Sequence, residues 1–106
     1  MRKITETMAQ AFAEGVAKKN GNTVVAVDSV YVEMRLHGNV IAKRKHNERK
    51  VQINTCGWQS VTTKERLNGV LGYYGCGYIQ QQNWNWYWVQ GTEKTAIKSG
   101  VWITVR

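Results

Sequence analysis

Apolar residues recur at steps of three and four positions over the first part of the chain, from Arg2 to Lys19. This spacing places them along one stripe and predicts an amphipathic helix whose outer face carries charges of both signs. Gly15 lies on the same stripe, where a glycine weakens a helix but permits close approach of a sheet. The run Asn20-Gly21-Asn22 predicts the end of the helix. The stripe consists of Ile4, Met8, Ala11, Phe12 and Val16.

A two-residue period replaces this pattern between residues 23 and 55. Residues 30–37 alternate most clearly, with apolar side chains at every even position, as expected for a strand with one buried face. Residues 40–45 form a return strand that becomes polar toward its far end, residues 50–55 alternate again, and residues 23–27 form a β-branched run. The pair Gly38-Asn39 is typical of a tight turn. We therefore expect four strands in an antiparallel meander.

A second helix is expected from about Thr62, because Thr62 and Glu65 have the spacing of a capping box. Gly72 and Gly75 are suitable residues for its end. Its apolar positions follow the helical steps i, i+3, i+4 and i+7, so this side should pack inward. The inward set is Leu67, Val70, Leu71 and Tyr74, and the set left for solvent or a ligand is Lys64, Arg66 and Asn68.

The last third predicts three more strands, over residues 77–81, 85–90 and 101–106, with a long connection from Gly91 to Gly100. Trp84, Trp86 and Trp88 alternate here and share one face of a strand. Two interpretations stay open: a core that uses the large area of tryptophan, or an exposed platform on which bases stack. Trp84, next to its turn, is expected to be the most exposed of the three.

Together these elements predict a single α+β domain over residues 1–106. An antiparallel sheet of meander and hairpin strands is packed by two helices, in the order α-β-β-β-β-α-β-β-β. A chain of 106 residues has room for one such domain, and its 42% hydrophobic content with no proline is typical of an ordered globule.

The chain carries fifteen Lys and Arg residues against seven Asp and Glu, a net charge of +8. Six of these cations lie from residue 35 to residue 50, on two predicted strands, the turn after them and the start of the next strand. Such a cluster favours binding of a polyanion such as nucleic acid, because cations that neutralise phosphates release the counterions condensed on them. Two plainer interpretations stay open: the charge provides solubility, or the lysines protect an edge strand from aggregation.

A two-stranded basic ribbon can lie in the major groove of duplex DNA. In this hypothesis the ribbon cations contact phosphates, while His37 or Asn39 approaches a base edge. Residues of the second helix and one tryptophan serve as auxiliaries. The candidate nucleic-acid-binding residues are Arg35, His37, Asn39, Lys43, Arg44, Lys45, Arg49, Lys50, Lys64, Arg66 and Trp84.

Catalytic and metal signatures are absent from the sequence. Its serines stand outside any nucleophile motif. Nineteen residues separate Cys56 from Cys76 and eight separate His37 from His46, so the sequence lacks the close pairs of a structural zinc site. We therefore expect a non-catalytic protein with reduced thiols, no cofactor and no metal.

Polar residues interrupt the apolar positions near the amino terminus, which does not have the pattern of a secretion signal. No run approaches the roughly 18 apolar residues that a membrane-spanning helix needs. We expect a soluble intracellular protein without a membrane partner.

Several segments resemble a group of small bacteriophage accessory proteins. The strongest are Leu36–Arg44 (LHGNVIAKR), the pair Gly57-Trp58, and Thr62–Gly69 (TTKERLNG). Met1–Thr5 and Asn22–Val25 are similar as well. The connection from Gly91 to Gly100 is longer than the pattern of that group.

The resemblance implies an accessory protein that acts in the cytoplasm of an infected bacterial host. Two tasks are common for such proteins. One is binding DNA or RNA of the phage or host, which agrees with the basic cluster and is the leading hypothesis. The alternative is inhibition of a host protein or ribonucleoprotein, such as a CRISPR effector, a restriction enzyme or RNA polymerase. Self-association through an exposed tryptophan face is a further prediction.

Overall fold

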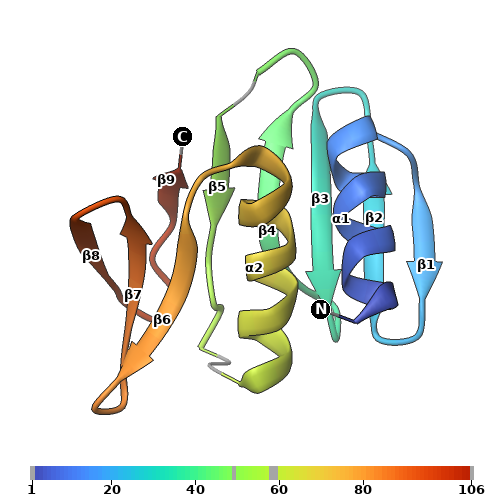
Figure 1. Cartoon of the computed structure of the whole chain (residues 1–106). Helices are drawn as coiled ribbons and strands as arrows, with labels where there is room; N and C mark the ends of the chain where they lie inside the picture. Colours follow the sequence, from blue (N-terminus) through green and yellow to red (C-terminus); the bar gives the residue numbers. More distant parts are fainter. Residues whose placement is uncertain (1, 49, 58–59, 106) are drawn as a thin grey trace.

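The computed structural model describes residues 2–48, 50–57 and 60–105. Its two helices lie in front of a six-stranded antiparallel sheet, and a three-stranded antiparallel sheet stands beside them (Figure 1). This arrangement confirms the predicted α+β class, with antiparallel strands packed by two helices. The elements are α1 (Lys3–Glu14), β1 (Lys18–Asn20), β2 (Thr23–Val27), β3 (Tyr31–Leu36), β4 (Asn39–Lys45), β5 (Val51–Ile53), α2 (Val61–Tyr74), β6 (Tyr78–Gln82), β7 (Asn85–Gln90), β8 (Glu93–Ile97) and β9 (Ile103–Val105).

Two short strands add to the predicted order. Helix α1 ends at Glu14 rather than at Lys19, because Gly15 adopts a left-handed φ of 71° and caps the helix. The chain then turns, and β1 pairs with β2. Val16, expected on the buried stripe, is therefore 52% exposed. Strand β8 occupies part of the predicted long connection and pairs with β7.

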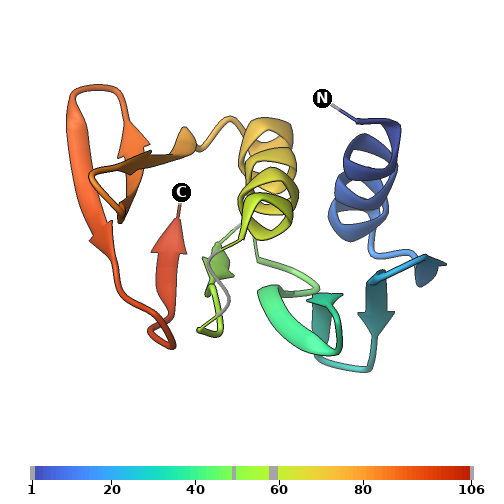
Figure 2. The same ribbon diagram turned by 90° about the horizontal axis from the view of Figure 1, so that it is seen from below.

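The large sheet has the strand order β1-β2-β3-β4-β5-β9, and both helices cover the same side of it (Figure 2). Strands β3 and β4 are thus central strands, flanked by β2 and β5. They do not form a free-standing ribbon, as the groove hypothesis requires. The side of the large sheet opposite the helices is called the open face below.

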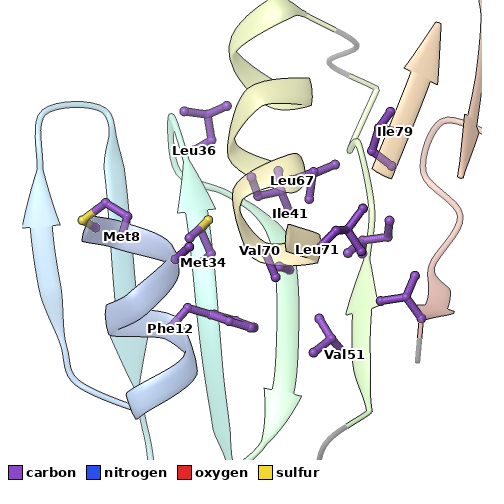
Figure 3. Packing of buried hydrophobic residues seen from close by; sticks show 14 of the residues in the cluster. Met8, Phe12, Met34, Leu36, Ile41, Val51, Leu67, Val70, Leu71 and Ile79 are labelled. Atoms are coloured by element: carbon purple, nitrogen blue, oxygen red, sulfur yellow. The ribbon is translucent and has the colours of Figure 1, made fainter. Parts of the chain in front are cut away.

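The main core lies between the helices and the large sheet (Figure 3). Met8 and Phe12 of α1 are fully buried, and so are Leu67, Val70 and Leu71 of α2. They pack on the inner positions of the strands, as their helical and two-residue periods predict. The inner strand residues are Val25, Val32, Met34, Leu36, Ile41, Val51 and Ile53.

Helix α2 begins differently from the prediction. The cap is Ser60, whose Oγ accepts a hydrogen bond from the Thr63 backbone N–H (3.1 Å), so the predicted box of Thr62 and Glu65 is wrong. Close approach of the two helices requires Gly69, because a Cβ there would lie 2.4 Å from the Thr5 methyl group.

Glu65 instead joins the two helices. Its carboxylate accepts hydrogen bonds from Thr5 Oγ1 (2.5 Å), Arg2 Nε (2.9 Å) and Arg66 Nη1 (3.0 Å). The Thr5 hydrogen bond, followed by Arg2, lowers the pKa of Glu65. Arg66 is only 3% exposed and also donates from Nε to Thr23 Oγ1 (3.0 Å). It therefore links α2 to α1 and β2 and does not face solvent, which corrects its expected position.

A β-bulge in β4 decides which side chains of this strand face inward. Met34 pairs with Ala42 but Arg35 pairs with Val40, so Ile41 is an extra residue. Ile41 and Ala42 are both buried. An extra residue reverses the phase of the strand beyond it. Lys43 and Lys45 therefore lie on the open face, and Arg44 between them lies on the helix side.

Arg44 consequently points toward the carboxyl end of α1 and is only 8% exposed. Its Nη2 donates to the carbonyls of Phe12 (3.0 Å) and Ala13 (2.8 Å), and its Nη1 to the carbonyl of His46 (3.2 Å). A cation suits this position, because the carboxyl end of a helix carries partial negative charge. The prediction that Arg44 faces outward is wrong.

The Arg44 contacts predict a specific loss of stability. Arg44→Met should lower the free energy of unfolding by about 3 kcal/mol, because buried carbonyls lose charged donors. Lys45→Met is the matched control and should change it by less than about 0.5 kcal/mol. Urea unfolding measures both, and equal stabilities of the two variants would contradict this role of Arg44.

Candidate functional site

The open face carries most of the predicted binding cluster. Strand pairing and alternation place on it Lys19 of β1, Tyr31, Glu33 and Arg35 of β3, Lys43 and Lys45 of β4, Gln52 of β5 and Thr104 of β9. Lys50 extends this row just before β5. In Figure 2 both helices lie on the other side of the sheet. No described helix or strand covers these side chains, which are exposed or half-buried.

Positive charge dominates this surface. Its described residues include five cations, Lys19, Arg35, Lys43, Lys45 and Lys50, against Glu33 and, at the edge, Glu48. Glu33 partly neutralises the middle, since its carboxylate pairs with Arg35 (2.7 Å). An exposed pair of this kind contributes little to stability. The excess charge is concentrated beyond it, toward Lys45 and Lys50.

Two aromatic rings lie beside the cations. The Nζ atom of Lys43 is 4.3 Å from the centre of the Trp102 ring and 5.7 Å from the centre of the Tyr31 ring. Both rings are half-buried. The contact holds a lysine against ring faces by cation–π attraction. Tyr31, Lys43 and Trp102 form a row across the open face, which we call the aromatic strip.

A polar depression of about 270 Å³ adjoins the aromatic strip. Lys45 and Lys50 provide its positive charge, and Glu48 opposes them. The remaining lining residues are Tyr31, Arg44, Gln52 and Thr104. Arg44 forms part of the wall of the depression. Its guanidinium donates to backbone carbonyls and so is not counted as a donor to a ligand. The size and charge of the depression suit a phosphate group.

The structure divides the predicted residues into separate groups. Lys43, Lys45 and Lys50 come together, with Arg35 nearby but paired. His37 and Asn39 are exposed at the opposite end of the β3–β4 hairpin, about 20 Å along the strand from Lys45. The others lie apart: Arg44 and Arg66 are buried, Lys64 is on α2, on the helix side, and Arg49 falls outside the described residues.

Trp84 belongs to the other sheet. It is 89% exposed in the turn between β6 and β7, while Trp86 is 3% exposed and Trp88 Nε1 donates to the Cys76 carbonyl (2.6 Å). The core interpretation therefore holds for Trp86 and Trp88. Trp84 does not share their strand face, because it lies in the turn and adopts a left-handed φ of 67°.

A family model described as Kyanoviridae Gp96 protein matches residues 1–104 of the chain. The chain belongs to this family. It is therefore a small phage protein, as the sequence resemblance implied. No curated protein and no solved structure matches the chain.

Sequence reasoning missed two residues of the site in this Gp96-family protein. Tyr31 was predicted on the outer face of its strand but received no role. Trp102 lies in the strand predicted over residues 101–106 but was also given no role. The available signal was alternation: Trp102 and Thr104 lie in phase with each other and out of phase with the buried Val105.

Neither Cys56 nor Cys76 of the Gp96-family chain forms a disulfide. Cys56 Sγ donates to the Val40 carbonyl (2.9 Å), and burial raises the pKa of the Cys56 thiol, which disfavours a nucleophilic thiolate. Over residues 2–48, 50–57 and 60–105, no three His, Cys, Asp or Glu side chains gather closely enough to hold a metal ion. Neither described helix is long and apolar enough to cross a membrane.

Proposed function

We propose that this phage accessory protein binds nucleic acid, without catalysis, in the cytoplasm of the infected host. The single observation that carries the proposal is the gathering of Lys43, Lys45 and Lys50 on the open face beside two aromatic rings. Cations and ring faces together are the two chemistries that phosphates and bases require.

Charge supports a polyanionic ligand. The net charge of +8 gives long-range attraction, and the open face adds local contacts. Lys45 and Lys50 at the depression can each neutralise a phosphate. Arg44 and Arg66 are buried, so they cannot contact phosphates as the sequence predicted. The affinity should therefore depend on a small number of lysines.

The double variant Lys43→Glu with Lys45→Glu tests the proposal. It should lower affinity for nucleic acid by at least about tenfold at low salt, because two phosphate contacts become repulsive. The slope of log affinity against log salt should also become shallower, by about 0.7 to 0.9 for each lost contact. Fluorescence anisotropy with labelled oligonucleotides over a salt series measures both.

The matched control is Lys3→Glu with Lys18→Glu. It changes the net charge equally, on exposed residues of α1 and β1 that lie off the open face. This control should retain most of the affinity. Equal losses in the two double variants would show that total charge, rather than the open face, determines binding and would refute the proposal.

A second function, binding a host protein, is favoured by Trp84. This residue combines 89% exposure with a left-handed backbone, a conformation that is unfavourable for a bulky side chain and usually taken by glycine at this turn position. The two-residue turn requires this backbone, but nothing in the turn requires a tryptophan in place of glycine. Tryptophan is also a frequent anchor of protein interfaces. The neighbouring exposed residues Gln81, Gln82, Asn83 and Asn85 are neutral amides, suited to a partner that is not a polyanion.

The Trp84 hypothesis is tested by affinity purification from infected cells after nuclease treatment. A specific host partner should be recovered with the Lys43→Glu, Lys45→Glu variant and lost with Trp84→Ala, because truncating an anchor costs about 2 kcal/mol or more of binding energy. Recovery of the same proteins with Trp84→Ala would reject this function.

A further inference from the structure

We infer that the open face selects single-stranded over duplex nucleic acid, with bases on Trp102 and Tyr31 and a phosphate in the adjoining depression. This inference rests on the proposed nucleic-acid function and names its ligand class. It follows from three features: the central position of the basic strands, the spacing of the rings, and the place of the depression.

The basic strands cannot enter a groove as a ribbon. Strands β3 and β4 have hydrogen-bonded neighbours on both sides, β2 and β5, so the cations lie on a broad sheet. A major groove about 12 Å wide admits a helix or a two-stranded ribbon, not a six-stranded sheet. Duplex DNA could touch this surface only with its backbone, which leaves the rings unused.

The aromatic strip suits unpaired bases. The distances from Lys43 Nζ place the centres of the Trp102 and Tyr31 rings no more than 10 Å apart. This upper limit corresponds to at most about three nucleotide steps at ~3.4 Å per stacked step, so one short segment of a strand can reach both rings. Bases inside a duplex have both faces covered by their neighbours, whereas a single strand can turn a base onto a protein ring.

The depression lies where the backbone of such a strand would continue. Tyr31 belongs to both the aromatic strip and the depression, so a base on its ring brings the connected phosphate near Lys45 and Lys50. The Thr104 hydroxyl and the Gln52 amide line the same depression and can donate to phosphate oxygens. The Nζ atom of Lys43 lies 4.3 Å from one ring centre and 5.7 Å from the other, where it can pair with a phosphate between the two bases.

The experiment compares probes of equal length with the full chain. These are a single-stranded oligothymidylate of about 12 nucleotides, the matching oligouridylate, a DNA duplex, and an abasic strand that has phosphates without bases. Trp102→Leu removes the ring, Trp102→Phe keeps one, and Trp84→Leu is the control for loss of an exposed tryptophan elsewhere. Circular dichroism verifies that each variant is folded.

The single strands should bind at least about tenfold more tightly than the duplex or the abasic strand. Trp102→Leu should remove this preference, Trp102→Phe should preserve most of it, and Trp84→Leu should not change it. Comparison of the DNA and RNA strands shows which sugar is favoured.

Equal affinity for duplex and single strand, with no effect of Trp102→Leu or of Tyr31→Leu, would overturn the inference. In that case a loss of binding in Lys43→Glu, Lys45→Glu would still support the proposed function. No binding to any probe would instead refute the proposed function itself. The two failures are therefore distinguishable.

Discussion

The β-bulge at Ile41 determines which charges of this protein are available to a ligand. It buries two successive residues of β4 and reverses the phase of the strand beyond them. Lys43 and Lys45 then face solvent, and Arg44 faces the helices. If the same sequence alternated regularly from Val40 onward, with no bulge, the arginine would lie on the open face and both lysines would point into the core. The surface chemistry of the sheet thus depends on one irregularity in its pairing.

Arg44 and Arg66 show how the layers are held together. Each is enclosed, and each makes several hydrogen bonds between elements that are far apart in sequence. A buried guanidinium is tolerated only when its donors are satisfied, which here requires the end of α1 for Arg44 and Thr5, Thr23 and Glu65 for Arg66. Both helices are thereby fixed on one side of the sheet. The other side stays exposed as a consequence.

Much of the fold could be predicted from local patterns. The helical stripe of α1, the inward residues of α2 and the alternation of β3 all reflect periods that burial imposes on a chain. The sequence did not predict the short strands β1 and β8. No residue of β1 is buried and only Ile97 of β8 is, so neither strand shows a two-residue period. The boundary of α1 depended on Gly15, which serves as a cap rather than as an interior residue.

The candidate site was predicted only in part, for a physical reason. The order of residues shows that lysines and arginines cluster along the chain. The face of the sheet on which each side chain lies depends on the strand register, and a bulge cannot be recognised from alternation alone. Arg44 and Arg66 were therefore assigned to a ligand although the interior uses them. Trp102 was missed for another reason: alternation separates it from Ile103 and Val105, but the sequence does not show which face of the sheet the helices leave uncovered.

Mapping of NMR chemical shifts during titration with a single-stranded oligonucleotide tests the central claim most directly. Signals of the open face should move together, above all Tyr31, Lys43, Lys45, Trp102 and Thr104, while signals of α1 and α2 stay in place. Shifts confined to the helices or to the Trp84 turn, or no shifts at all, would contradict the conclusion that the exposed side of the large sheet is the binding surface.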